Sequence, residues 1–230
     1  MTAASTQPVK LAIAGAAGRM GQRLCALALE TPGVTLAEAF DHPEYDVRDE
    51  RAAGSNVPIT TFYSGGADVL IDFTAPPGTR DLIGRCVETG TALVIGTTGL
   101  DDDDQRLIDA AAGSIGIIQA TNFSLVVNVL NLLAARAAHI LGNSYDIEIA
   151  EAHHRHKKDA PSGTALTLAR EICAATGRSF EDDVVTSRSG ADCPRDDRQI
   201  TVQALRLGDV VGEHTVMFAA PGERMELKHI

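Results

Sequence analysis

The sequence predicts an α/β fold in which a doubly wound parallel sheet precedes an α+β domain with a mixed sheet. Three observations support this. Short apolar runs alternate with helical patterns over the first half, a glycine-rich turn follows the first run, and the pattern changes after Asn122. Short buried strands that alternate with helices are typical of parallel sheets. We therefore expect two domains, over residues 1–122 and 123–230.

In the first domain the apolar runs are four to seven residues long. Strands are expected at residues 9–15, 35–40, 68–73, 92–95 and 116–120. Apolar residues at helical spacing predict helices at residues 19–30, 78–88 and 101–112. This order of elements gives the β-α alternation of a doubly wound sheet.

The second domain begins with a long amphipathic segment, residues 125–141, which predicts a helix. Alternating patterns at residues 145–152, 199–207, 210–219 and 225–230 predict strands. Because Gly208-Asp209 separates two of them, we expect residues 199–207 and 210–219 to pair as an antiparallel hairpin.

Composition excludes several classes of protein. With 230 residues and 44% hydrophobic content, the chain can bury real cores. Its net charge of -11 argues against binding to nucleic acid or to an acidic membrane, since both need a broad excess of Lys and Arg. No stretch reads as a membrane span or a signal peptide. The four cysteines form no CxxC pair, so we expect reduced thiols that fill space in a cytoplasmic protein.

The glycine-rich turn reads GAAGRMG, from Gly15 to Gly21, between the first strand and the first helix. Glycines there let the backbone approach a pyrophosphate, and the positive end of the helix dipole faces its charge. Asp41 lies 20 residues beyond Gly21, where an acid accepts hydrogen bonds from an adenosine ribose. Together they predict a Rossmann-like dinucleotide site, although the spacing GxxGxxG differs from the commoner GxGxxG. Its candidate residues are Gly15, Ala16, Ala17, Gly18, Arg19, Met20 and Asp41.

Two later strand ends extend this candidate cofactor site. Ligands of doubly wound folds bind at the carboxyl edge of the sheet. Two loops are expected at that edge, and their candidate residues are Gly96, Thr97, Thr98, Ala120, Thr121, Asn122 and Phe123. In this position Asn122 would hydrogen-bond the carboxamide of a nicotinamide.

A basic block, EAHHRHKKDAPSGTA at residues 151–165, stands out in this acidic chain. It predicts a site for a small anion, and the sequence PSGT resembles a helix start whose free N–H groups would hold a carboxylate. Three histidines also suggest a metal, but the neighbouring Arg155, Lys157 and Lys158 would repel a cation, so we expect none. A solvated run of charge is the remaining alternative.

The motifs GAAGRMG, IDFTAPPGT, VIGTTG, ATNFSLVVNV, EAHHRHKKDAPSGTA and GEHTVMF occur in this order. Over nearly the whole chain they resemble the dihydrodipicolinate reductases of lysine and diaminopimelate biosynthesis, which reduce a cyclic imine dicarboxylate with NADH or NADPH. The resemblance implies that His153 and Lys157 are proton donors, and that His154, Gly163 and Thr164 bind the substrate. It also implies a homotetramer built through the second domain, which would be a substrate-binding and oligomerisation domain.

Three further expectations concern cofactor, class and length. Asp41 should repel a 2′-phosphate, and His42 is a poor substitute for the arginine that receives it in some relatives, so NADH is favoured over NADPH. The alternatives are a non-catalytic NAD-binding regulatory homologue and a semialdehyde dehydrogenase, which needs a cysteine nucleophile. Family members continue past the position of Ile230 into a returning segment, so we expect this chain to be a truncated and less active form.

Overall fold

The computed structural model describes residues 7–45 and 50–230. Its internal contacts divide the chain into two compact units, Met1–Ala120 (unit 1) and Thr121–Ile230 (unit 2). The division lies two residues before the boundary expected from the sequence. Each unit has its own sheet and its own buried core, and each is described by itself below.

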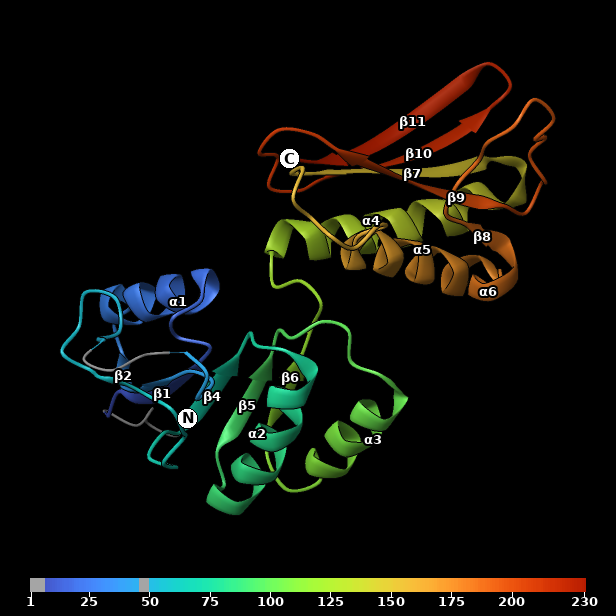
Figure 1. Cartoon of the computed structure of the whole chain (residues 1–230). Helices are drawn as coiled ribbons and strands as arrows, with labels where there is room; N and C mark the ends of the chain where they lie inside the picture. Colours follow the sequence, from blue (N-terminus) through green and yellow to red (C-terminus); the bar gives the residue numbers. More distant parts are fainter. Residues whose placement is uncertain (1–6, 46–49) are drawn as a thin grey trace. The chain divides into compact units, whose positions relative to one another are not determined.

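Unit 1 is built on a six-stranded sheet (Figure 1). In spatial order the strands are β3 (Ile59–Thr60), β2 (Val34–Phe40), β1 (Val9–Ala14), β4 (Val69–Asp72), β5 (Ala92–Ile95) and β6 (Ile117–Gln119). Every neighbouring pair is parallel. The chain starts in the middle of the sheet, builds one half and then crosses to build the other. This order confirms the prediction of a doubly wound parallel sheet.

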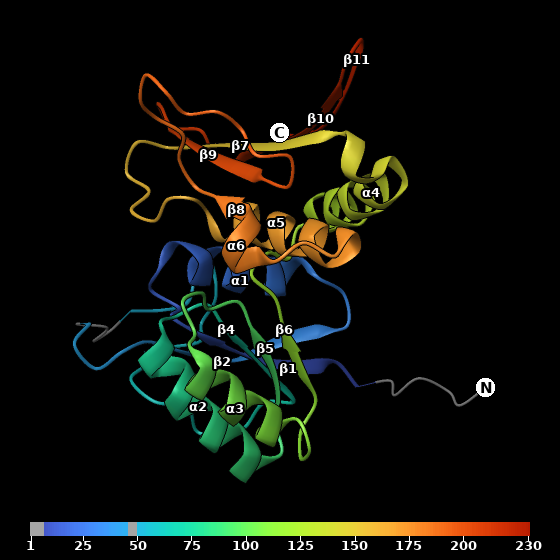
Figure 2. The same ribbon diagram turned by 90° about the vertical axis from the view of Figure 1, so that its right-hand side faces the viewer.

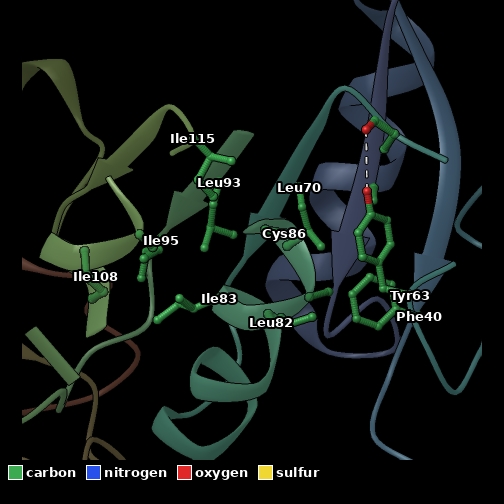
Figure 3. Packing of buried hydrophobic residues seen from close by; sticks show 14 residues of the cluster. Phe40, Tyr63, Leu70, Leu82, Ile83, Cys86, Leu93, Ile95, Ile108 and Ile115 are labelled. Atoms are coloured by element: carbon green, nitrogen blue, oxygen red, sulfur yellow. Dashed lines mark hydrogen bonds between the residues drawn. The ribbon is translucent and has the colours of Figure 1, made fainter. Parts of the chain in front are cut away.

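Helices cover both faces of this sheet, because successive residues of a buried strand point to opposite sides. In β1, Ile13 packs with α1 (Arg19–Glu30), whereas Ala12 and Ala14 face the cluster formed with α2 (Pro76–Thr89) and α3 (Asp102–Ala111). Figure 3 shows the second cluster, in which Leu70, Leu93 and Ile95 from the strands meet Leu82, Ile83, Cys86 and Ile108 from the helices. These two cores hold the carboxyl edge of the sheet in place.

Unit 2 contains a five-stranded mixed sheet. In spatial order the strands are β11 (Glu223–His229), β10 (Glu213–Ala220), β7 (Asp146–His153), β9 (Ile200–Arg206) and β8 (Val184–Val185). The pairs β11–β10 and β10–β7 are antiparallel, and β7–β9 and β9–β8 are parallel. The mixed sheet was predicted correctly.

The expected hairpin between residues 199–207 and 210–219 is wrong. The two strands, β9 and β10, run in opposite directions, but β7 lies between them and pairs with both. The Gly208-Asp209 turn therefore connects two strands that are separated by β7 and are not neighbours in the sheet. In the central place, β7 has a hydrogen-bonded neighbour on each side, and its Ile147 and Ile149 are fully buried in the core of unit 2.

Two helices, α4 (Leu125–Leu141) and α5 (Gly163–Thr176), lie side by side on one face of this sheet (Figures 1 and 2). The core between them and the strands contains Leu130, Leu168, Ile172 and Phe218. A short turn, η1 (Gly142–Ser144), follows α4, and α6 (Phe180–Asp183) follows α5. The loop from β7 to the start of α5 carries most of the basic block.

One expectation about α4 needs correction. With the turn that follows it, the helix Leu125–Ser144 has the length and composition of a membrane span, which the sequence reading had excluded. The core helix of a folded domain passes the same test, and α4 contributes Val127, Leu130, Ala134 and Ala138 to the core of unit 2. Its length and composition are therefore weak grounds for a membrane segment.

The cysteines follow the expectation in three cases out of four. Cys25, Cys86 and Cys173 are unpaired and buried, but Cys193 is exposed and fills no space. Burial raises the pKa of Cys25 to about 11 and that of Cys86 to about 12. These thiols are protonated near neutral pH and are poor nucleophiles.

Candidate active site

The glycine-rich turn lies between β1 and α1, and two of its glycines have a clear structural reason. Gly15 has a φ of 71°, a backbone conformation that side chains disfavour. A Cβ on Gly21 would lie 2.0 Å from the carbonyl oxygen of Gly15, so only glycine lets the helix start this close to the turn. Gly18 is the N-cap of α1 and, within the described part of the chain, no side chain caps it. The first-turn N–H groups beside Arg19 and Met20 are therefore available to an anion.

Asp41 lies at the end of β2, next to this turn. Its Oδ2 accepts a hydrogen bond of 2.8 Å from the N–H of Ala17, and its Oδ1 accepts one from the N–H of His42. The neighbouring Ala16 N–H donates to the carbonyl of Phe40. Asp41 thus ties the turn to β2, and each of its oxygens keeps a further lone pair for a ribose hydroxyl.

At the carboxyl edge of the sheet, the ends of β4 and β5 are bonded together. Buried Asp72 accepts from the N–H and hydroxyl of Thr74, and the Thr74 N–H also reaches Oγ1 of Thr97 at 3.1 Å. Gly96 is required because a Cβ there would lie 2.3 Å from the ring of Phe73. Thr98 is exposed, and the N–H of Ala120 bonds to Ile95. The loop residues expected at this edge are therefore neighbours of one another in unit 1.

Three other residues of the expected cofactor site, Thr121, Asn122 and Phe123, belong to unit 2. The side-chain amide of Asn122 donates to Oγ1 of Thr164 at 3.1 Å, and Thr121 and Thr167 share a hydrogen bond of 3.2 Å. A residue predicted to contact the cofactor therefore touches one predicted to contact the substrate. The amide oxygen of Asn122 accepts from the Ser124 N–H, the N-cap of α4.

The basic block begins inside β7 and continues through a turn. His153 is the last residue of β7, and the N–H of Lys157 bonds to the carbonyl of His154, which closes the turn. The ammonium of Lys157 lies 2.8 Å from Oδ2 of Asp159. The rings of His154 and His156 are 6.4 Å apart. His153, His154 and Lys157 are thus held by backbone that connects β7 to α5.

Helix α5 begins as the sequence predicted. Ser162 is its N-cap, and the serine hydroxyl accepts from the N–H of Ala165 at 3.2 Å. Gly163 and Thr164 are the first two residues of the helix, so their N–H groups lie at its positive end. This is the place where the sequence predicted a carboxylate to bind.

A buried carboxylate, Glu151, connects these parts. Its Oε2 lies 2.6 Å from Nδ1 of His153, and its Oε1 accepts from the N–H of Ser162 at 2.9 Å. Both oxygens accept from the guanidinium of Arg206, at 2.8 and 2.9 Å. Burial alone would raise the pKa of Glu151, but the bonds from Arg206, His153 and Ser162 outweigh it and hold the pKa below its usual value.

A second buried histidine, His214, stands beside this group. Its ring lies edge-on to that of His153 with 5.3 Å between centroids, and its Nε2 lies 3.3 Å from the Ser162 hydroxyl. Burial, and then the charge of His153, lower the pKa of His214 to about 4. The ring is therefore neutral near pH 7.

Sequence reasoning missed Glu151, Arg206, Ser162 and His214 as members of the site. One signal was present: Glu151 and His153 are two positions apart in a strand and so share a face. The contribution of Arg206 depends on the pairing of β7 with β9, where it lies opposite His153. Among the described residues, no group of three or more His, Cys, Asp or Glu side chains could hold a metal ion.

Two family models match the chain, one for each unit. Residues 9–123 match the dihydrodipicolinate reductase N-terminus, and residues 126–230 match the dihydrodipicolinate reductase C-terminus. The chain belongs to the dihydrodipicolinate reductase family. The resemblance noted from the motifs is thereby confirmed.

Relatives within this family are similar over almost the whole chain. The 4-hydroxy-tetrahydrodipicolinate reductase of Chromobacterium violaceum is 45% identical, over 95% of this chain and 85% of that protein. The enzyme of the same name from Paraburkholderia phymatum is 46% identical, over 96% and 86%. These are similarities to reductases, not to a regulatory protein.

Solved structures agree with the fold. Dipicolinate-bound dihydrodipicolinate reductase from Paenisporosarcina sp. TG-14 superposes with a TM-score of 0.72 and 24% identity, over 97% of this chain and 88% of that one. Aspartate semialdehyde dehydrogenase II from Vibrio cholerae has a TM-score of 0.55 and 12% identity, over 92% and 72%. At these identities the likeness shows the fold alone.

Proposed function

We propose that this chain reduces 4-hydroxy-tetrahydrodipicolinate to tetrahydrodipicolinate, with loss of water, at the expense of NADH or NADPH. The observation that carries the proposal is the connected group of His153, Glu151 and the start of α5, folded from the basic block. Family membership supports the same activity. The product serves lysine and diaminopimelate biosynthesis in this family.

The substrate is a ring with two carboxylates, and unit 2 offers two kinds of partner for them. The N–H groups of Gly163 and Thr164 lie at the positive end of α5 and suit one carboxylate. His154 and the cationic side chains of the turn suit the other. Because Asn122 donates to Oγ1 of Thr164, the loop that follows β6 supports this end of the substrate site.

When bound, the nicotinamide supplies a hydride to the unsaturated ring. The glycine turn, Asp41 and the loops after β5 and β6 are the residues that would hold it, and their free N–H groups and lone pairs fit a dinucleotide. Hydride addition leaves an electron pair on the substrate, and His153 and Lys157 are the groups proposed to protonate it. Together these residues bind, orient and protonate one dicarboxylate.

We favour NADH over NADPH as the preferred cofactor. If Asp41 accepts hydrogen bonds from the adenosine ribose, its negative charge lies close to a 2′-phosphate and repels it. His42 follows it with a largely exposed side chain that already approaches Glu44, with 3.9 Å between Nδ1 and Oε2. Specificity constants for the two cofactors test this preference. A preference for NADPH would contradict it and would assign the phosphate to Arg19 or another cation.

The two alternative functions are less well supported. A regulatory homologue would have no reason to keep the proton-donor group, and the similar proteins are reductases. A semialdehyde dehydrogenase needs a thiolate, but burial raises the pKa of Cys25, Cys86 and Cys173. The unpaired cysteines are in keeping with a reducing compartment, and we propose a cytoplasmic enzyme.

We also propose a homotetramer built through the mixed sheet of unit 2. Helices α4 and α5 cover one face of this sheet, and Ala150, Ala152, Met217 and Ala219 alternate onto the other. These four small or apolar side chains suit close packing against a second sheet, on a face that also carries Asp146, Glu148, Glu213 and Thr215. Sedimentation equilibrium at micromolar concentration tests the proposal, which a monomer would contradict.

The activity is tested by following NADH oxidation in a coupled assay. The substrate is generated from aspartate semialdehyde and pyruvate by the preceding synthase, and absorbance at the nicotinamide band is recorded with and without each component. We expect oxidation that needs both precursors. NADH binding without oxidation would overturn the activity and favour a regulatory homologue.

A further inference from the structure

Glu151 contacts more of the candidate site than any residue that the sequence had singled out. It lies in β7, two residues before the end of the strand, with 1% of its surface exposed, and accepts hydrogen bonds from three different segments of unit 2. A buried carboxylate costs several kcal/mol unless its oxygens are satisfied. Here Arg206, Ser162 and His153 satisfy them.

These contacts determine which nitrogen of His153 reacts. An ionised carboxylate only accepts hydrogen bonds, so the Nδ1 of His153, 2.6 Å from Oε2, must carry a proton. The proton that the ring gives and takes is then the one on Nε2. Gly212 borders that atom: a Cβ built on Gly212 would lie 3.0 Å from Nε2 of His153. The absence of a side chain at position 212 leaves Nε2 room to meet a ligand.

The other oxygen of the same carboxylate holds the start of α5. Oε1 accepts from the N–H of Ser162, immediately before Gly163 and Thr164, and Arg206 also donates to the carbonyl of Asp159 at 2.6 Å. The proton donor and the proposed carboxylate-binding N–H groups are therefore fixed to one rigid group. Small errors in such spacing cost rate, because the reacting atoms must approach within about 3–3.5 Å.

We propose that Glu151, held by Arg206, is a positioning residue for the reduction: it fixes the tautomer and orientation of His153 and the distance from His153 to the start of α5. This inference rests on the proposed function. Glu151 itself touches neither substrate nor cofactor and acts through His153 and Ser162.

Glu151→Gln is the informative variant because it keeps the shape and changes one acceptor into a donor. In the wild type each oxygen faces two donors, one of them from Arg206. In the variant, the side-chain NH2 group of the glutamine replaces one of these oxygens, so it faces two hydrogen-bond donors. Arg206 and the Ser162 N–H cannot become acceptors, but the neutral imidazole can, by moving its proton from Nδ1 to Nε2. The variant should therefore carry the wrong tautomer.

A matched control exists in unit 1. Asp104 is also fully buried, is bound by Arg80, and accepts from the N–H of Asp101, the N-cap of α3. Asp104→Asn therefore removes the same charge from the same kind of group. Among the hydrogen bonds of the described residues, those of Asp104 include none from a histidine.

The experiment combines ¹⁵N NMR of histidine-labelled protein with steady-state kinetics. At a pH where the His153 ring is neutral, we expect the proton on Nδ1 in the wild type and in Asp104→Asn, and on Nε2 in Glu151→Gln. We expect kcat to fall about 100-fold or more in Glu151→Gln with KM changed less than about threefold, and to stay near the wild-type value in Asp104→Asn.

The outcomes separate the two proposals. An unchanged tautomer with unchanged kcat in a folded Glu151→Gln protein would overturn the positioning role. If Glu151→Gln does not fold, the wild-type spectrum decides, and a proton on Nε2 there would overturn the role. Wild-type protein that shows the Nδ1 tautomer but oxidises no NADH would refute the proposed function and leave the positioning geometry standing.

Discussion

Asp104 in unit 1 and Glu151 in unit 2 are carboxylates whose side chains have no exposed surface. Each is bound by an arginine, Arg80 or Arg206, and each accepts from the backbone N–H of a helix N-cap, Asp101 or Ser162. In both, the hydrogen bonds hold the carboxyl pKa below its usual value. The local chemistry of the two groups is the same.

The difference is one contact. Asp104 and Asp101 form a capping box that fastens the start of α3 and ends there, whereas Glu151 also accepts from Nδ1 of His153. In unit 1 this arrangement stabilises the start of a helix. In unit 2 the added histidine gives it a second role in our proposal, which is to determine which nitrogen of His153 carries a proton. Arginine–carboxylate pairs are common in folded proteins, so the added histidine is the informative feature.

The largest expected effect comes from removing the groups that Glu151 directs. His153→Ala and Lys157→Ala should each lower kcat by about 100-fold or more, with little change in NADH affinity, because each takes a proton donor from the reacting ring. His154→Ala should act on substrate KM instead. Stopped-flow turnover and NADH titration check this. Unchanged kcat in both variants would show that neither residue takes part in the reaction and that Glu151, like Asp104, has only a structural role.

The next largest expected effect is a loss of stability at acid pH that is greater in unit 2 than in unit 1. The folded protein keeps His214 neutral with a pKa of about 4, against an ordinary value of 6.5. Between pH 6.5 and 4 the unfolded chain binds this proton and the folded chain does not, so stability is lost as pH falls through that window, by about 3 kcal/mol. Glu151 adds a further loss below its ordinary value of 4.5, because its folded pKa is lowered.

Hydrogen exchange of peptides from β7 and β10, compared with peptides from α3, measures this acid effect. We expect protection in β7 and β10 to weaken from pH 6.5 downward, and the variant His214→Gln to lose less over the same window. Equal loss in the wild type and in the variant would show that His214 is not responsible.

A smaller effect is expected at Gly212. Gly212→Ala places a Cβ 3.0 Å from Nε2 of His153, so the neighbouring ring must give way by a few tenths of an ångström. We expect kcat/KM to fall about tenfold. Gly84→Ala is the control, because a Cβ there meets nothing within 4 Å and lies in α2, where alanine adds about 0.5–1 kcal/mol of stability. Equal kcat/KM in Gly212→Ala and the wild type would remove Gly212 from the approach to His153.

Much of the fold could be predicted from the sequence. Apolar runs predicted the longer parallel strands of unit 1 to within about a residue, because buried parallel strands carry a continuous apolar signal. Local chemistry also predicted the start of α5 from PSGT. Two-residue strands such as β3 and β8 were missed, since they are too short to hold a pattern.

The predictions that were wrong or missing concern contacts between segments that are distant in the sequence. A turn at Gly208-Asp209 is local, but whether β9 pairs with β10 or with β7 depends on a strand more than fifty residues earlier. The same pairing brings Arg206 to Glu151. The site residues predicted from the basic block lie in one short segment, whereas Arg206, which pairs with Glu151, comes from a strand that is distant in the sequence.

The central claim is that Glu151 acts on the reaction through His153, and a double-mutant cycle tests it most directly. Turnover is measured for Glu151→Gln, for His153→Ala and for the double variant, with unfolding midpoints to confirm that each is folded. If one acts through the other, the double variant should be no slower than His153→Ala alone, within about twofold. Losses that multiply, about 10⁴-fold in the double variant, would mean that the two residues act independently and would contradict the account.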